Sequence, residues 1–378
     1  MKTKLRLAAV GAAAVLTLAA CATPPEATPT TPAASETETS TETETTEPPA
    51  AAVEGFRPCI VSDAGGFDDK SFNQLSFEGL ERAANELGVE FGQVQSNSDA
   101  DFKNNLESLV ATDCTLITSV GFALSAATVE SALANTELNY VLVDDAADND
   151  FDGNVDAPNI KPLLYDTAQA AFLAGYLAAG FSEAGKVGTF GGMPFPTVTI
   201  FMDGFKQGVE HYNEVNGAEV QVIGFEGGDQ GSFTGGFEAN QDARNVADGI
   251  IDQGVDVILP VGGPIYQSAL DSIADSGRDI ALIGVDADFF VTDPSTADVV
   301  LTSILKQMDV SVYDAVIAAS SGEFDPTPYV GTLENGGVGI APLHNFESKV
   351  DAALVAEVEQ LKADIISGAV TVTSYLNQ

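Results

Sequence analysis

Basic side chains are scarce in this 378-residue sequence. Only 15 lysines and arginines stand against 56 aspartates and glutamates, which gives a formal net charge of −41. Such a chain repels polyanions, so nucleic acid and anionic membrane surfaces are excluded as partners of a folded body. We interpret the excess of carboxylates as a means of staying soluble, for example in a saline habitat, and not as a description of the ligand.

Histidine and cysteine are also rare. The chain has two histidines, His211 and His344, and three cysteines without a paired motif, so no zinc ligand set is evident and no metal or cofactor is expected. No Gly-x-Ser-x-Gly motif occurs and no histidine follows a predicted strand, so we do not expect an enzyme. The adjacent acids Asp144 and Asp145 leave glycoside or nucleoside hydrolysis as an alternative.

Long apolar runs are missing as well. Lys2, Lys4 and Arg6 precede an apolar stretch over residues 7–18, which is shorter than the ~20 residues of a membrane-spanning helix. This pattern is typical of a signal peptide over residues 1–20. It closes on Leu-Ala-Ala-Cys, which resembles the lipobox of bacterial lipoproteins and implies that Cys21 carries lipid. An ordinary signal peptide that ends near an incidental cysteine is the alternative.

Residues 21–52 are rich in threonine, glutamate, proline and alanine, and no large apolar side chain occurs before Val53. Such a segment cannot bury enough surface to fold, and its prolines and carboxylates favour an extended chain. We expect a disordered acidic tether that joins the lipidated Cys21 to a body on the extracytoplasmic face of the cell membrane. Glycosylation of its threonines is left open.

After Val53 the sequence alternates between strand-like and amphipathic helical stretches. This alternation predicts an α/β fold with two doubly wound parallel-sheet lobes and a ligand cleft between them. Lobe 1 is expected over 53–165 with about 305–330, and lobe 2 over 166–304 with about 331–378. The predicted strands are 57–61, 89–94, 114–120, 139–144, 186–190, 218–224, 256–260, 280–285, 299–304 and 336–341. The predicted helices are 72–87, 100–112, 124–135, 166–181, 197–214, 235–253, 264–276, 306–320 and 347–367.

Two cysteines, Cys59 and Cys114, each open an apolar strand-like run. In an exported protein such a pair favours a disulfide, which neighbouring parallel strands would permit. Two free buried thiols are the alternative.

The loop after the first strand, residues 63–74, carries the most specific chemistry. It lacks the Gly-x-Gly-x-x-Gly spacing of a dinucleotide site and the Gly-Lys-Ser/Thr of a phosphate loop. Ser71 and Gln74 have the spacing of a capping box for the next helix. Capping does not explain Phe72 and Asn73, whose aromatic face and amide would suit a flat polar ligand.

The run Gly-Phe-Asp-Asp-Lys-Ser-Phe-Asn-Gln over residues 66–74 resembles the signature of the basic membrane protein family, the PnrA-like nucleoside-binding lipoproteins of ABC importers. The similarity continues through Gly121-Phe122, Ile283-Gly284-Val285-Asp286 and Thr302-Ser303-Ile304-Leu305-Lys306, over about residues 57–345. It implies a type I periplasmic-binding-protein fold that captures a nucleoside, purine by preference, and delivers it to an ABC permease. We expect a monomer.

The resemblance also implies roles for particular residues. Phe72 would be one wall of an aromatic clamp on the base, whose edge Asn73 and Asp63 would contact. The ribose and nearby polar contacts would fall to Asp144, Asp286 and Lys306. Asp63, Asp144 and Asp286 each follow a predicted strand, and ligands of parallel sheets bind at the ends of the strands. A carboxylate can also accept two hydroxyl hydrogens. The alternative for each is a helix N-cap.

Two departures from the family pattern leave the ligand open. Where the family has Phe-Ala-Gly after a strand, this chain has Val261-Gly262-Gly263, so Gly262 and Gly263 are candidate contacts without an aromatic neighbour. Tyr266 and Phe233 are then the candidates for the second aromatic wall. Ala287-Asp288 replaces the family's acid-glutamine pair after Asp286. A sugar-binding protein of the same fold, or a surface sensor or adhesin without transport, are the alternative functions.

Overall fold

The computed structural model describes residues 53–377. The predicted signal peptide (residues 1–20), the predicted lipidation site Cys21 and the predicted tether (residues 21–52) lie outside the described residues. Within 53–377, no helix is both long and apolar enough to cross a membrane.

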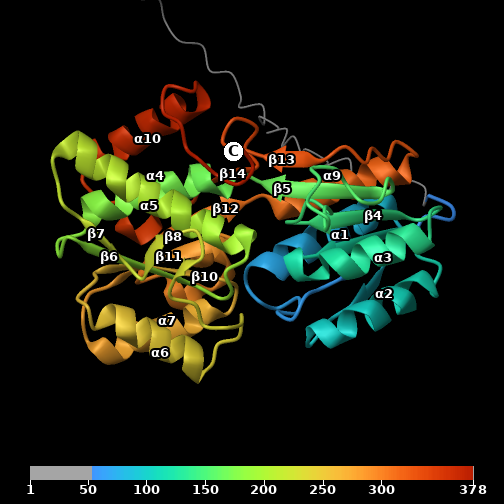
Figure 1. The fold of residues 1–378 in the computed structure, drawn as a ribbon, viewed down its shortest axis with the longest axis horizontal. Helices are drawn as coiled ribbons and strands as arrows, with labels where there is room; N and C mark the ends of the chain where they lie inside the picture. The colour runs from blue at the N-terminus through green and yellow to red at the C-terminus, as the bar shows by residue number, and fades with distance from the viewer. Residues whose placement is uncertain (1–52, 378) are drawn as a thin grey trace, which may run out of the picture. The chain divides into compact units, whose positions relative to one another are not determined.

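The apolar runs form two six-stranded sheets, which are the centres of two lobes (Figure 1). Lobe 1 has a wholly parallel sheet in the order β13-β5-β4-β3-β1-β2. Its strands are β1 (Pro58–Val61), β2 (Gly92–Val94), β3 (Leu116–Val120), β4 (Asn139–Val143), β5 (Ile160–Tyr165) and β13 (Tyr329–Gly331). Most of these side chains are buried, as expected for a parallel sheet with helices on both faces.

Lobe 2 has the sheet order β14-β12-β11-β10-β6-β7, parallel except for β14 at one edge. Its strands are β6 (Lys186–Gly191), β7 (Gln221–Ile223), β10 (Val257–Val261), β11 (Ala281–Asp286), β12 (Val300–Lys306) and β14 (Val338–Ile340). A small antiparallel pair, β8 (Phe225–Gly227) and β9 (Gln230–Gly231), lies beside it. Each lobe therefore presents the carboxyl ends of its central strands at one edge.

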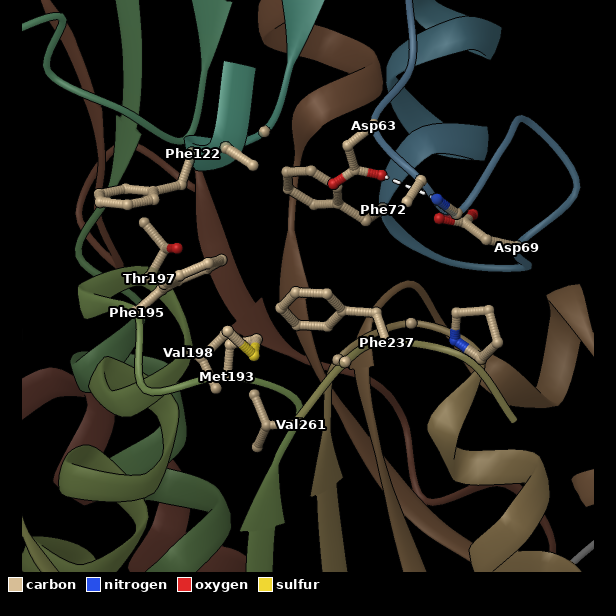
Figure 2. A pocket seen from close by; sticks show the side chains of 18 of the residues that line it. Asp63, Asp69, Phe72, Phe122, Met193, Phe195, Thr197, Val198, Phe237 and Val261 are labelled. Carbon is tan, nitrogen blue, oxygen red and sulfur yellow. Dashed lines mark hydrogen bonds between the residues drawn. The ribbon is translucent and has the colours of Figure 1, made fainter. Parts of the chain in front are cut away.

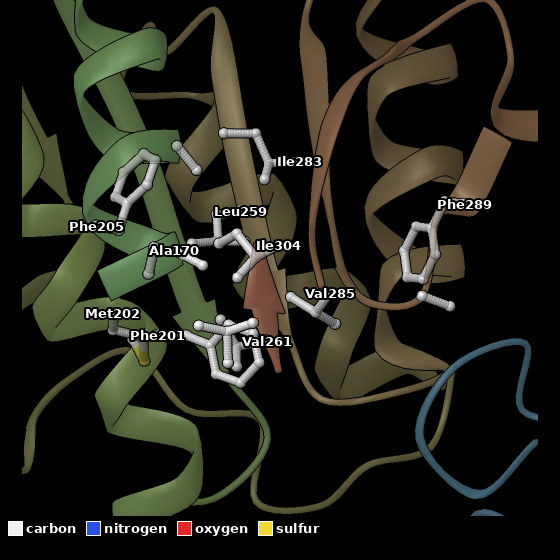
Figure 3. Close-up of a cluster of buried hydrophobic side chains, with 14 of the residues drawn as sticks. Ala170, Phe201, Met202, Phe205, Leu259, Val261, Ile283, Val285, Phe289 and Ile304 are labelled. Carbon is white, nitrogen blue, oxygen red and sulfur yellow. The ribbon is translucent and has the colours of Figure 1, made fainter. Parts of the chain in front are cut away.

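Helices cover both faces of each sheet. Around lobe 1 lie α1 (Phe72–Leu87), α2 (Phe102–Val110), α3 (Ser125–Ala134) and α9 (Met308–Ser320), and around lobe 2 lie α4 (Thr167–Phe181), α5 (Pro196–Asn216), α6 (Gln241–Ile251), α7 (Ile265–Ser276), α8 (Phe289–Thr292) and α10 (Ala352–Ile366). Helix α4 is apolar all round because it is buried between the sheet, α5 and α10. Gly175 and Gly208 permit the close α4–α5 contact, since a Cβ at either would clash with the facing backbone. Figure 3 shows this core, where Phe201 and Phe205 face Leu259 and Ile304.

The chain passes between the two lobes three times. It crosses from β5 to α4, from β12 to α9, and from β13 to β14. The crossing segments are bonded to one another, because the Asp166 amide donates to the Gly331 carbonyl at 2.8 Å and the Gln307 amide to the Gly337 carbonyl at 3.0 Å. They form a narrow three-stranded connection on one side of the cleft.

A disulfide joins Cys59 of β1 to Cys114, just before β3, with the Cα atoms 5.9 Å apart. Strands β1 and β3 are hydrogen-bonded neighbours, which brings the two cysteines together. Of the two alternatives that the sequence left open, the structure has the bonded form.

Several elements differ from the predictions, and strands β8 and β9 and helix α8 fall outside the predicted strands and helices. The helix predicted from 235 begins only at Gln241, where the Asn240 side chain accepts from the amides of Asp242 and Ala243. The preceding residues instead continue alongside β6, with the Thr234 amide donating to the Gly191 carbonyl. Strands β5 and β13 were not predicted, and β5 includes Pro162, which cannot donate to a ladder.

Candidate functional site

A cavity of about 440 Å³ lies between the lobes, at the carboxyl ends of their central strands. This volume falls within the range of small-molecule sites, roughly 300–1,000 Å³. The cavity is lined by every ligand contact predicted from the family resemblance: Asp63, Phe72, Asn73, Asp144, Gly262, Gly263, Asp286 and Lys306. Figure 2 shows Asp63 and Phe72 entering from the lobe 1 side and Phe237 and Val261 from the lobe 2 side.

On the lobe 1 side, Asp63, Asn73 and Asp69 form a hydrogen-bonded network. The Asn73 amide group donates to Asp63 Oδ1 at 2.7 Å and to Asp69 Oδ2 at 3.0 Å, while Asn73 Oδ1 accepts from the Asp63 amide. Gly65 also donates its amide to Asp63 Oδ1. Burial raises the pKa of Asp63 to about 6, although the hydrogen bond from Asn73 opposes the rise. The network holds Asp63 at the cavity as an acceptor.

The capping box predicted for Ser71 and Gln74 is wrong. Asp69 caps α1 instead, because its carboxylate accepts from the backbone amides of Ser71, Asn73 and Gln74 at 2.8–3.1 Å. The Gln74 side chain donates to Glu78, one turn further on. The Ser71 side chain makes no cap hydrogen bond and reaches across to lobe 2.

Three buried charged groups meet at the base of the cavity. Lys306 Nζ, at the end of β12, lies 2.6 Å from Asp144 Oδ2 and 3.6 Å from Asp286 Oδ1. Burial raises the pKa of both aspartates, and the neighbouring Lys306 opposes that rise. Both aspartates have a positive φ of 66°, which directs them away from the ends of β4 and β11.

One oxygen of this group lacks a hydrogen bond. Within residues 53–377, Asp286 Oδ1 is buried and accepts none, whereas Asp286 Oδ2 accepts from Ser71. This oxygen has the Lys306 ammonium 3.6 Å away, beyond hydrogen-bond distance, so it can accept a hydrogen bond from a ligand in the cavity.

Neither candidate for the second aromatic wall lines the cavity. Tyr266 is fully buried inside lobe 2, where its ring lies 4.3 Å from that of Phe289 and its hydroxyl donates to Asp293. Phe233 packs beside the end of β6, against Gly191. Both residues lie in elements whose apolar side chains are needed for the core of lobe 2.

Five other phenylalanines line the cavity with Phe72: Phe102, Phe122, Phe195, Phe201 and Phe237. Figure 2 labels Phe122, Phe195 and Phe237 around the cavity. Phe122 of lobe 1 stacks on Phe195 of lobe 2, with ring centroids 4.9 Å apart, and Phe195 lies 5.9 Å from Phe237. Phe237 lies in the irregular segment before α6, where sequence periodicity gave no sign of it. The available signal was its position directly after Gly235-Gly236.

Gly262 and Gly263 follow β10 and have positive φ values of 142° and 50°. A Cβ at Gly262 would lie 2.7 Å from the Phe237 ring. Gly262 therefore leaves space for the Phe237 ring at the cavity.

Outside the cavity, one acidic group among residues 53–377 has oxygens close enough to share a metal ion, formed by Asp148, Asp150 and Asp156. The spacing of Asp148, Asp150, Asp152 and Gly153 matches the first half of a calcium loop, but its twelfth position is Asn159 in place of glutamate. Asp148 and Asp156 already accept backbone amides of their own loop. We assign no ion to this loop.

Comparison with known proteins gives a family match over most of the described chain. The model of a family described as "ABC transporter substrate-binding protein PnrA-like" matches residues 58–374. The chain is 28% identical over 335 residues to the ABC transporter nucleoside-binding protein BmpA of Lactococcus lactis, covering 84% of this chain and 89% of that protein. It is 29% identical over 288 residues to an uncharacterized lipoprotein of Pyrococcus abyssi, covering 74% of this chain and 67% of the relative.

Among solved structures, a solute-binding protein of an ABC transporter system from Aeropyrum pernix superimposes with a TM-score of 0.74 at 25% identity. The match covers 85% of this chain and 94% of the other. It places the two-lobed α/β architecture among solute-binding proteins.

Proposed function

We propose, because this chain belongs to the family of PnrA-like ABC transporter substrate-binding proteins, that it captures a nucleoside between its lobes and delivers it to a membrane permease. The family resemblance and the type I periplasmic-binding-protein fold expected from the sequence are both confirmed.

The observation that carries the proposal is a buried acceptor next to an aromatic surface in one cavity. Asp286 Oδ1 is buried without a hydrogen bond from residues 53–377, and Lys306 and Asp144 lie beside it. Vicinal ribose hydroxyls would donate to the two aspartates and accept from Lys306. A nucleoside combines such hydroxyls with a flat base.

The aromatic side of the cavity would hold that base. Phe72 and Phe237 line the cavity from opposite lobes (Figure 2), so lobe closure would bring a ring against each face of a base. Stacking of a base on an aromatic ring contributes about 1–3 kcal/mol. Asp63 would accept an N–H group of the base edge, because both of its side-chain hydrogen bonds from residues 53–377 end on Oδ1 and leave Oδ2 free for the ligand.

The anchor completes the proposal. Lipid on Cys21 would hold the protein at the extracytoplasmic face of the cell membrane, where the permease could read the closed form of the lobes. The Pyrococcus relative is named a lipoprotein, which supports this location.

A thermal-shift screen tests the ligand class. A ligand bound far above its dissociation constant raises stability by several kcal/mol, so inosine, guanosine or adenosine should raise the melting temperature while pentoses and hexoses should not. A rise with sugars alone would establish the sugar-binding alternative. Release of free base during incubation would establish a hydrolase, and tight binding without loss of uptake on deletion would establish a sensor.

A matched pair of variants tests the site. Asp286→Asn removes the charge at the cavity, and we expect nucleoside affinity to fall at least tenfold in calorimetric titration. Asp288→Asn is the control, because Asp288 pairs with His344 and does not line the cavity. Equal affinities for the two variants would remove Asp286 from the site.

A further inference from the structure

Ser71 joins the two lobes directly. It precedes α1 in lobe 1, is fully buried, and its hydroxyl lies 2.9 Å from Asp286 Oδ2 and 3.0 Å from the Val285 carbonyl. Both acceptors belong to β11 in the sheet of lobe 2. A serine hydroxyl has one hydrogen, so it donates to one of these acceptors at a time.

Helix α1 does not need the Ser71 hydroxyl. Asp69 already accepts three amides at the start of the helix, and the Ser71 backbone, at φ −148° and ψ −111°, turns the side chain away from them. Serine before a helix ordinarily bonds the amide two or three residues on. Here that bond is replaced, which leaves the hydroxyl for the other lobe.

The Ser71 contact differs from the other buried polar contact between the lobes. Lys306 also bonds across, to Asp144, but it stands one residue before Gln307, in the connection that joins the lobes covalently. Ser71 lies on an element that takes no part in the three crossings. Its contact with Asp286 can therefore exist only when the lobes are together.

We propose that Ser71 is a positioning residue that couples lobe closure to the ligand site. On closure its hydroxyl donates to Asp286 Oδ2, which fixes the carboxylate so that Oδ1 faces the cavity. The neighbouring Phe72 reaches the cavity in the same movement. Ser71 itself touches no ligand. We call this Ser71–Asp286 contact the latch. The choice of nucleosides as probes rests on the proposed function, whereas the latch does not.

The test compares Ser71→Ala with Ser76→Ala in the full chain. Ser76 is an equally buried serine of α1, but its hydroxyl donates to the Phe72 carbonyl within its own helix. With inosine and guanosine as probes in stopped-flow experiments, Ser71→Ala should raise the dissociation rate about tenfold, which corresponds to about 1.4 kcal/mol, and leave the association rate nearly unchanged. Ser76→Ala should change neither, and Ser71→Thr should restore slow dissociation.

Inter-lobe distances give a readout that a purely structural serine would not move. Spin labels on Leu133→Cys in lobe 1 and Val215→Cys in lobe 2, both exposed positions, report the separation of the lobes. Ser71→Ala should shift the distances toward longer values, with and without probe, at an unchanged melting temperature of the ligand-free protein. Distances and dissociation rates identical to those of Ser76→Ala overturn the proposal. If the wild type binds neither nucleoside but Ser71→Ala still lengthens the distances, the nucleoside function fails and the latch stands.

Discussion

Asp144 and Asp286 occupy a backbone conformation that L-residues seldom adopt. Each has a φ of 66°, and each lies at the carboxyl end of an inner strand in its own sheet. Such conformations persist where the surrounding structure fixes them, and they gather at functional sites. In each sheet, a residue with positive φ at the end of a strand thus places a carboxylate next to Lys306. Asp144 comes from lobe 1 and Asp286 from lobe 2.

In the proposed site, Phe237 takes the place of the expected second aromatic wall. Phe237→Ala should weaken nucleoside binding at least tenfold and leave the weak binding of free ribose nearly unchanged, because only the base stacks on the ring. Calorimetric titration with inosine and ribose measures both. Phe233→Ala, in the same segment but outside the cavity, is the control for folding of the loop. An equal loss for inosine and ribose would argue against stacking.

Asp63 gives the site a measurable pH dependence. Its pKa is about 6 in the folded protein, above the ordinary value of 3.8. The stability it contributes is therefore fully present below about pH 4 and is lost as the pH rises through 6. Relative to wild type, ligand-free Asp63→Asn should gain on the order of 1–3 kcal/mol of unfolding free energy between pH 4 and pH 7.5. Urea denaturation across this range measures the difference, and parallel curves for the two proteins would refute it.

At the scale of elements, α1 depends on Asp69 for its N-terminus. Asp69→Ala should lower the free energy of unfolding by about 1–2 kcal/mol, because three helix amides lose their acceptor. It should also weaken nucleoside binding, because Asn73 loses one of its partners. Chemical denaturation and titration measure the two effects. Asp68→Ala is the matched control, since exposed Asp68 pairs only with Lys70; an equal effect of both changes would contradict the assignment.

The same helix shows how far the sequence predicts structure. Its bounds, 72–87, were predicted as observed, because an amphipathic run ends at Gly88, which takes the left-handed conformation that stops a helix. Its cap was predicted wrongly, because both Ser71 and Asp69 are able to cap and only the distant Asp286 decides between them. The local sequence pattern therefore predicts where a helix lies. Which of two possible side chains caps it depends on tertiary contacts.

The missed elements have a similar cause. Strand β5 follows an irregular connection over residues 144–159 with no helix, so the alternation that revealed the other strands is broken there. Phe237 is placed by hydrogen bonds of its segment to Gly191 and Gly192, far away in the chain. The cavity residues of the loop 63–74 could be predicted because they belong to one contiguous sequence motif. Phe237 could not be predicted, because hydrogen bonds to distant residues position its segment.

At the scale of the whole molecule, the predicted membrane location depends on Cys21, which lies outside the described residues. Cys21→Ser should abolish lipidation, so metabolic labelling with a fatty acid should mark the wild type and not the variant, while the nucleoside affinity stays unchanged. Labelling followed by titration of the purified proteins measures both. Equal labelling of the two proteins would show that the lipobox interpretation is wrong.

The three crossings also set the order in which the two sheets can be completed as the chain is made from its N-terminus. A chain that emerges from its N-terminus delivers five strands of the first sheet by Tyr165, yet its edge strand β13 follows only after residue 328. The second sheet waits for β14, fewer than twenty residues later. Neither lobe has its full sheet before nearly all of the chain is present, so a chain that ends before residue 329 should leave an unpaired edge on β5 of lobe 1 and on β12 of lobe 2.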